Sequence, residues 1–203
     1  MKLHKLEKEL KQKGIRFVCG LDEAGRGPWA GPIVAAAVIL PGKIKLPGLK
    51  DSKKLNSKKR EKLFSIIERH ANYGIGIVSH TEIDRLGIVE STQIAFEKAL
   101  SALSSATQPE YLLIDGRDQF FFGIPAISII KGDTKVRCIA AASILAKVTR
   151  DRIMDEFDKE FPLYGFCKNK GYGVLSHHRA IIKHGICQIH RRTYEPIKTL
   201  TSK

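Results

Sequence analysis

The segment Ile15–Pro28, IRFVCGLDEAGRGP, predicts a buried β-strand that leads into two carboxylates and a glycine-rich turn. The run Ile15–Leu21 is rich in Val, Ile and Phe, and glycines interrupt the apolar pattern directly after Asp22 and Glu23. Neighbouring side chains of a regular strand point to opposite faces, so these two carboxylates can serve one site only where the chain bends. We therefore expect Asp22 and Glu23 at the end of a strand.

The turn Gly25-Arg26-Gly27 places a cation between two residues that let a backbone approach a ligand closely. The guanidinium of Arg26 can bind a phosphate, and neighbouring N–H groups add dipoles of the same sign. One interpretation is therefore a metal site at Asp22 and Glu23 beside a phosphate site. The alternative is a turn with solvated charges, since acidic residues and glycine are ordinary turn formers.

Further apolar runs and helical repeats predict an α/β fold with a mixed sheet. Strands are expected at Ile33–Leu40, Tyr73–Ser79, Tyr111–Asp115 and Ala126–Ile130. Helices are expected at Leu3–Lys11, after a cap at Asn56 or Ser57, at Thr81–Leu86, at Val89–Leu103 and from Thr134 onwards. We expect one domain over residues 1–203, with a core at about 15–160 and loops and short helices in 161–203.

The composition predicts affinity for nucleic acid or an anionic membrane, and nucleic acid is the favoured partner. Lys and Arg number 35 against 21 Asp and Glu, and the resulting net charge of +14 favours a polyanionic partner. No stretch approaches the length of a transmembrane helix, and the charged segment Met1–Lys13 lacks the apolar core of a signal peptide. We therefore expect a cytoplasmic protein with no membrane partner. The four cysteines are scattered without a CxxC pair, which makes a disulfide framework an unfavourable interpretation.

Three of the apolar runs end in acids, namely Asp22-Glu23, Asp115 and Asp133. Sites of α/β proteins gather outside strand ends, so these four carboxylates are expected to converge, although Asp133 also suits the N-cap of the following helix. Their mutual repulsion would be relieved by a hard divalent ion, and oxygen ligands favour Mg²⁺ or Mn²⁺ over zinc. Two such ions can activate water and stabilise the leaving oxygen of a phosphodiester. The sequence therefore predicts a metal-dependent nuclease whose catalytic ligands are these four residues.

Six segments resemble, in order, the motifs of bacterial ribonuclease HII, over about Val18 to Lys198. They are GLDEAGRGPWAGP, LLIDG, IIKGD, AAASILAKVTRDR, KGYG and HRRTYEP. The resemblance implies a ribonuclease H-like fold with a central five-stranded mixed sheet flanked by helices. It implies endonucleolytic cleavage of the RNA strand of RNA–DNA hybrids and incision 5′ of single ribonucleotides in duplex DNA, leaving 3′-hydroxyl and 5′-phosphate ends. It also places the family's metal-binding carboxylates on Asp22, Glu23, Asp115 and Asp133.

By the same resemblance, Gly25, Arg26 and Gly27 read the ribonucleotide at an RNA-to-DNA junction, and Tyr172 stacks on the next deoxyribose. A 2′-hydroxyl is the local mark that separates RNA from DNA, and close backbone groups with one aromatic plate can test for it. The alternative for Tyr172 is a core or turn aromatic. The sequence departs from some members in stopping soon after Lys198, so we expect substrate grip to rest more on the basic loops.

Two further groups of residues are candidate substrate contacts. Lys53 lies in the basic run Lys50–Arg60, where the match to Asp-Ser-Lys favours a phosphate contact over a merely solvated face. Ser143, Lys147 and Asp151 recur every four residues on the expected long helix. We expect Ser143 or Lys147 to reach a phosphate, and the alternative is an intrahelical pair between Lys147 and Asp151.

The C-terminal motif contains His190, Arg191 and Arg192, which by resemblance brace the active-site loop or touch substrate. A zinc site at His184, Cys187 and His190 is disfavoured because the spacing lacks a fourth ligand. We expect the partners to be RNA–DNA hybrids and duplex DNA containing ribonucleotides, bound by a monomer. A second hypothesis is a non-catalytic RNA–DNA binding module, whose binding would survive loss of the carboxylates.

Overall fold

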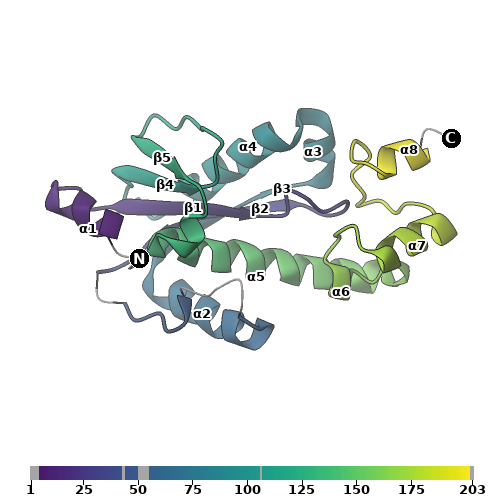
Figure 1. Cartoon of the computed structure of the whole chain (residues 1–203), viewed down its shortest axis with the longest axis horizontal. Coiled ribbons are helices and arrows are strands. Elements are labelled where there is room, and N and C mark those ends of the chain that lie inside the picture. Colours follow the sequence, from purple (N-terminus) through teal and green to yellow (C-terminus); the bar gives the residue numbers. More distant parts are fainter. Residues whose placement is uncertain (1–4, 43, 50–54, 106, 202–203) are drawn as a thin grey trace.

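The centre of the protein is a five-stranded mixed sheet, seen in a computed structural model that describes residues 5–42, 44–49, 55–105 and 107–201 (Figure 1). The strands are β1 (Val18–Ala24), β2 (Ile33–Ile39), β3 (Asn72–Val78), β4 (Tyr111–Asp115) and β5 (Ala126–Ile129). Their spatial order is β3-β2-β1-β4-β5, with β1 antiparallel to β2 and parallel to β4. The predicted five-stranded mixed sheet is therefore confirmed.

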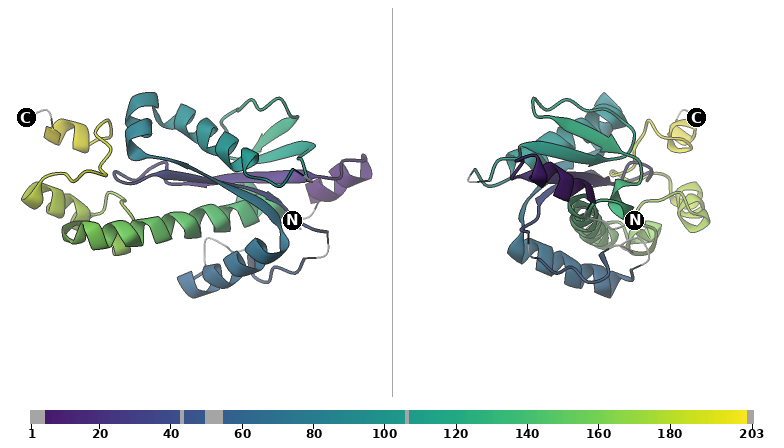
Figure 2. Two further views of the ribbon diagram at one scale, coloured as in Figure 1. Left: turned by 180° about the vertical axis from the view of Figure 1, so that it is seen from behind. Right: turned by 60° about the vertical axis from the view of Figure 1, so that its left-hand side comes forward.

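Helices cover both faces of this sheet, with α4 on one side and α5 on the other (Figures 1 and 2). The helical elements are α1 (Lys5–Gln12), α2 (Ser57–His70), α3 (His80–Leu86), α4 (Ile88–Ser101), η2 (Gly132–Thr134), α5 (Arg137–Glu160), η3 (Pro162–Tyr164), α6 (Phe166–Asn169), α7 (Leu175–His184) and α8 (Ile197–Thr201). Helix α2 packs on α5, and the short helices α6 to α8 gather near the C-terminal end of α5. No helix in these described ranges is both long and apolar enough to span a bilayer.

Small residues let α5 lie directly on β1. A Cβ atom added to Gly20 would stand 2.2 Å from the carbonyl carbon of Cys138, which only the absence of a side chain permits. Ala140, Ala141 and Ala142 are fully buried on the same helix. This close approach brings the N-terminal part of α5, and the turn η2 before it, to the strands that carry the acids.

Strand β1 is as long as the predicted run Ile15–Leu21 but begins and ends three residues later, at Val18 and Ala24. Asp22 pairs with Ala36 and Glu23 with Ala35 in the antiparallel ladder with β2, whereas pairing with β4 stops at Leu21. The predicted position of Asp22 and Glu23 at the end of a strand is confirmed, because β1 ends at Ala24. The strand continues past Leu21 because β2 is apolar and buried along its whole length and pairs with β1 up to Ala24. The two carboxylates thus lie inside β1, beyond its last pairing with β4.

Candidate active site

Three carboxylates, Asp22, Glu23 and Asp115, interact with one another where β1 runs past the end of β4. Asp22 is only 5% exposed, and burial, then repulsion by Glu23 and Asp115, raises its pKa well above the usual range. Burial also raises the pKa of Glu23 to about 7, although Arg26 opposes that shift. The hydroxyl of Ser143 donates a hydrogen bond to Asp22 and partly stabilises its ionised form.

Asp133 lies in the turn η2 and is joined to the end of β4 by the backbone. The N–H groups of Gly132 and Asp133 stand 2.6 and 3.3 Å from Oδ1 of Asp115, which accepts both hydrogen bonds. The side chain of Asp133 is fully buried. The N-cap of α5 is Val136, so the alternative role of Asp133 as the N-cap of that helix was wrong. The turn η2 separates the strand from the helix, which begins at Arg137 and not at Thr134 as predicted.

The acidic residues fit a hard divalent ion by their chemistry. Their donors are carboxylate oxygens, and burial with mutual repulsion of Asp22 and Glu23 is a cost that a bound divalent cation removes. As the side chains stand, no set of three or more His, Cys, Asp or Glu within residues 5–42, 44–49, 55–105 and 107–201 is arranged to hold a metal.

Arg26 is held by acids on both sides of the turn that carries it. Its Nη1 lies 2.6 Å from Oδ2 of Asp118 and 3.6 Å from Oε1 of Glu23. Asp118 belongs to the loop between β4 and β5 and was not predicted as a site residue. The sequence gives little indication of this role for Asp118, because the composition of the loop does not reveal that it passes close to Arg26.

A hollow of about 380 Å³ collects most of the predicted site residues. Its described lining consists of Glu23, Ala24, Gly25, Arg26, Gly27, Arg60, Ser143, Ile144, Lys147 and Tyr172. Lys147 lines the hollow and also pairs with Asp151 at 2.5 Å, so the intrahelical pair is confirmed. Phosphate contacts of Ser143 and Lys147 stay predictions. Lys53 lies outside the described residues, so its predicted contact has no counterpart in the structure.

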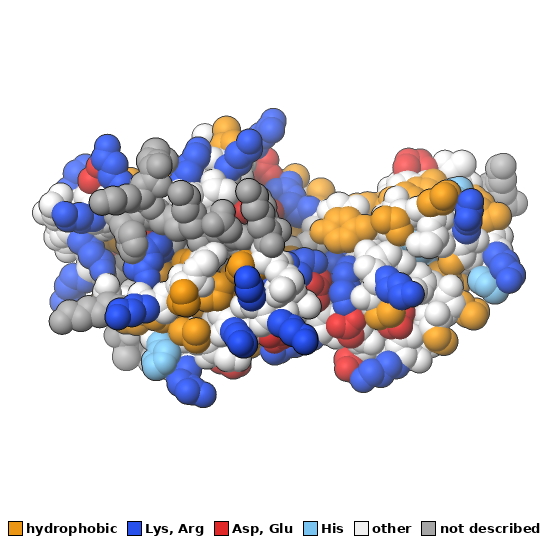
Figure 3. All heavy atoms as spheres, turned by 60° about the horizontal axis from the view of Figure 1, so that its bottom comes forward, with side chains coloured by type: hydrophobic (Ala, Val, Ile, Leu, Met, Phe, Trp, Pro, Cys, Tyr) orange, Lys and Arg blue, Asp and Glu red, His pale blue; other side chains and the backbone are white. Residues whose placement is uncertain are grey.

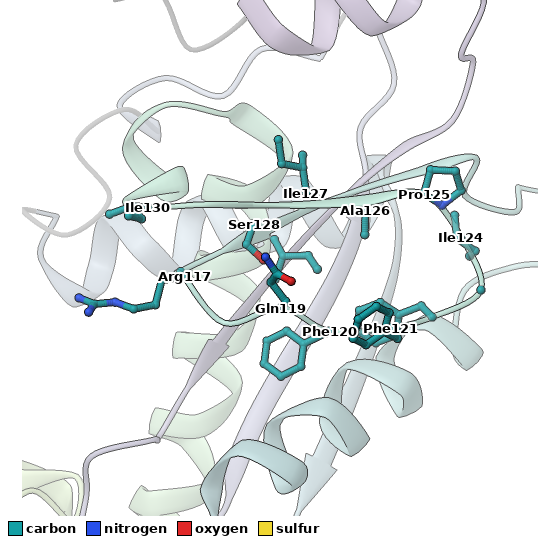
Figure 4. A pocket seen from close by; sticks show the side chains of 14 residues that line it. Arg117, Gln119, Phe120, Phe121, Ile124, Pro125, Ala126, Ile127, Ser128 and Ile130 are labelled. Atoms are coloured by element: carbon teal, nitrogen blue, oxygen red, sulfur yellow. The ribbon is translucent and has the colours of Figure 1, made fainter.

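A larger hollow of about 760 Å³ lies between strand β5 and the loop that precedes it (Figure 4). Its lining is mainly apolar, with Phe120 and Phe121 at one end and Arg117 with Ile130 at the other (Figure 4). The described residues that line it include none of the four predicted carboxylates. The smaller hollow, by contrast, is lined by Glu23, one of those four.

Arg191 braces the glycine-rich turn from inside the protein. Its side chain is fully buried, with Nη2 donating to the carbonyls of Gly25 at 2.6 Å and Gly31 at 2.9 Å. Its Nη1 donates to the carbonyl of Arg26 at 3.1 Å. Of the two roles predicted for Arg191, burial excludes direct contact with substrate, and the predicted bracing role agrees with these hydrogen bonds.

Arg150 is a second buried arginine and was not predicted as a site residue. Its guanidinium donates to the carbonyls of Ala30, Pro32 and Lys170 at 2.9 to 3.1 Å. It thus ties the segment after the glycine-rich turn to the loop that carries Tyr172, whose ring lies 5.8 Å from the Arg150 Cζ. The sequence feature that could have indicated Arg150 is its position seven residues after Ser143, on the same face of the helix.

Tyr172 is 42% exposed at the rim of the smaller hollow, which excludes a core role for its ring. The loop that carries it is closely fitted to Trp29, because a Cβ atom on Gly173 would stand 2.2 Å from the indole. Gly171 has a positive φ of 81°, and its carbonyl accepts the N–H of Trp29 at 2.8 Å. The loop is therefore placed against the segment that follows the glycine-rich turn.

Comparison with known proteins agrees with this geometry. Residues 19–197 match the ribonuclease HII family. The ribonuclease HII of Desulfitobacterium hafniense is 50% identical over 193 residues, covering 95% of this chain and 74% of that protein. That of Caldanaerobacter subterraneus subsp. tengcongensis is 52% identical over 189 residues, covering 93% and 78%. The crystal structure of ribonuclease H2 from Pyrococcus horikoshii superposes with a TM-score of 0.76 at 30% identity, covering 92% and 98%. The predicted ribonuclease H-like fold is confirmed, and the chain belongs to the ribonuclease HII family, whose members are endoribonucleases of the ribonuclease H type.

Proposed function

We propose that this ribonuclease hydrolyses the RNA strand of RNA–DNA hybrids and incises duplex DNA 5′ of a single embedded ribonucleotide, leaving 3′-hydroxyl and 5′-phosphate ends. The observation that carries the proposal is the hollow of about 380 Å³, where Glu23, the Gly25–Gly27 turn and Tyr172 meet. Asp22 and Asp115 interact with Glu23 at its edge. The net charge of +14 suits a nucleic-acid substrate, and Lys and Arg side chains are spread over the face in Figure 3.

Asp22, Glu23, Asp115 and Asp133 would hold Mg²⁺ or Mn²⁺ in a two-metal site. Such ions, when bound, make water a stronger nucleophile and stabilise charge on the leaving 3′-oxygen. The protein's own contribution is orientation. The Ser143 hydroxyl aims the carboxylate of Asp22, and two backbone N–H groups of η2 aim that of Asp115. These second contacts hold the ligands near their working positions before an ion binds.

Recognition of the ribonucleotide would fall to the Gly25–Gly27 turn and Tyr172, which face the same hollow. A backbone without side chains can come within hydrogen-bond distance of a 2′-hydroxyl, which deoxyribose lacks. The half-exposed ring of Tyr172 offers a flat apolar plate to the next sugar. Arg26 would exchange its contact with Asp118 for a backbone phosphate, since both partners are oxyanions.

The proposal is tested with end-labelled RNA–DNA hybrid and with duplex DNA carrying one ribonucleotide, each with Mg²⁺, with Mn²⁺ and with chelator. The variant Asp115→Asn should bind both substrates but lose turnover by a factor of at least about 10³, since it removes a metal ligand. Glu156→Gln is the matched control, because it removes an exposed carboxylate near the C-terminal end of α5. Cleavage in chelator, or full activity of Asp115→Asn, would contradict the metal site.

A further inference from the structure

Two buried histidines face each other behind the loop that carries Tyr172. His177 of α7 and His190 have no more than 1% of their surface exposed, and their Nε2 atoms are 3.0 Å apart. Aromatic rings enclose the pair, with Trp29 and Phe166 against His177 and Tyr164 against His190. Neither histidine reaches the smaller hollow, so the hydrolytic chemistry proposed above makes no use of them.

The shortest contacts of this pair define one direction for its hydrogen bonds. The backbone N–H of Cys187 donates to Nδ1 of His190 at 2.9 Å, which is shorter than the distances from that nitrogen to the Sγ of Cys187, 3.1 Å, and to its carbonyl oxygen, 3.3 Å. We therefore assign Nδ1 of His190 as the acceptor of this N–H, which places the proton of the neutral ring on Nε2. The Nε2–H of His190 then donates to Nε2 of His177. His177 must therefore carry its own proton on Nδ1, which donates to the carbonyl of Tyr172 at 2.9 Å.

Both rings must be neutral for this chain of hydrogen bonds to exist. Burial lowers the pKa of His190 to about 4, with a further contribution from His177, and burial also lowers the pKa of His177. A proton added to Nε2 of His177 would set two N–H groups against each other, and a proton added to Nδ1 of His190 would break the hydrogen bond that this atom accepts from the N–H of Cys187. Burial therefore keeps both imidazoles neutral, and the chain of hydrogen bonds intact, at neutral pH.

The chain of hydrogen bonds ends at Tyr172, the residue that the proposed function places against the sugar. The carbonyl of Tyr172 accepts from His177 and from the N–H of Val174, also at 2.9 Å, while its own N–H donates to Asn169. His190 is followed directly by Arg191, whose guanidinium holds the carbonyls of Gly25 and Arg26. The same short segment thus supports both recognition elements, one through the imidazoles and the other through the guanidinium.

We propose that His177 and His190 are positioning residues that fix Tyr172 relative to the Gly25–Gly27 turn and so set the preference for substrates with an RNA-to-DNA junction. The inference rests on the proposed function, in which Tyr172 stacks on the sugar after the ribonucleotide. Both histidines act through Tyr172, since neither is accessible to substrate. Their loss should change the ratio of kcat/KM between a single-ribonucleotide duplex and a continuous hybrid.

The test is a double-mutant cycle between His177 and Tyr172. The variant His177→Phe keeps a ring but has no donor, and it should lower the kcat/KM ratio about tenfold, the scale of one lost hydrogen bond. The variant His177→Asn keeps an amide donor near the place of Nδ1 and should recover most of that ratio. Once Tyr172→Ala has removed the ring, adding His177→Phe should change the ratio less than about twofold. A second tenfold loss on that background would overturn the inference.

Three controls separate a positioning role from a structural one. His184→Phe makes the same change at an exposed histidine of α7 and should leave kcat/KM for both substrates unchanged. Imidazole ¹⁵N NMR of the wild-type protein at pH 7 should show His177 protonated at Nδ1 and His190 at Nε2, and the reverse tautomers or a charged ring would overturn the inference even if the variants misfold. If Tyr172→Ala leaves the kcat/KM ratio of the two substrates unchanged, the junction role of Tyr172 is refuted. If Tyr172→Ala alters that ratio but His177→Phe does not, only the positioning role of the histidines is refuted.

Discussion

The ion pair between Arg26 and Asp118 should restrain substrate binding, and its removal gives a quantitative test. Nη1 of Arg26 lies 2.6 Å from Oδ2 of Asp118, with side chains 34% and 31% exposed. An ion pair with this much solvent contact is worth up to about 1 kcal/mol, because water screens it. A phosphate that takes over Arg26 must break that pair, so Asp118→Asn should tighten binding by up to about fivefold.

The assay is fluorescence anisotropy of a single-ribonucleotide duplex, with both proteins carrying Asp115→Asn so that the substrate survives. The gain from Asp118→Asn should be largest at low salt and should shrink toward 0.5 M salt, where charge interactions extend only about 4 Å or less. Glu156→Gln is the control for the change in net charge, because it also removes a carboxylate from an ion pair on α5. Weaker binding by the Asp118 variant at low salt would refute competition and would show that Asp118 orients Arg26 for the substrate.

Further predictions concern the framework around the site. Gly20→Ala should lower the free energy of unfolding in urea by about 3 kcal/mol or more, because its Cβ would lie 2.2 Å from the α5 backbone, whereas Gly27→Ala should stay within about 0.5 kcal/mol because its Cβ would meet open space. Arg191→Met should cost about 3 kcal/mol of stability, since it leaves the buried carbonyls of Gly25 and Gly31 without donors, and Arg191→Lys should recover only part of it. The free energy of unfolding should fall as pH drops from about 6.5 to about 4, because His190 binds a proton near pH 6.5 in the unfolded chain but only near pH 4 in the folded protein. Denaturation measured across this pH range should show a shallower fall in His190→Gln.

The strands could be predicted because burial on both sides of a sheet demands apolar runs. Ile33–Ile39, for example, is buried at every residue and has no alternative placement. The extension of β1 to Ala24 could not be predicted in this way, because it depends on pairing with β2, a contact between segments whose register the local sequence does not encode. The same limit applies to η2, which displaces the start of α5 to Arg137.

Side chains that line the hollow, and Arg191 behind it, could be found from their motifs, whereas the other residues that support it could not. Gly25, Arg26 and Tyr172 stand in runs whose glycines already indicate close approach to a ligand. Arg150 and His177 look like ordinary polar residues of amphipathic helices, and their role emerges only when the carbonyls of distant loops meet them. Asp118 lies in a loop with no repeating pattern, so its approach to Arg26 is a tertiary contact without a local signature.

The most direct test of the central claim is to map the cut in an end-labelled DNA duplex that carries one ribonucleotide, beside an identical all-DNA duplex and one with 2′-O-methyl at that position. We expect one metal-dependent cut on the 5′ side of the ribonucleotide, a 3′-hydroxyl on the upstream fragment, and no cleavage of the two duplexes that lack a free 2′-hydroxyl. Cleavage of the all-DNA duplex, or an upstream fragment that ends in a 2′,3′-cyclic phosphate, would contradict this claim.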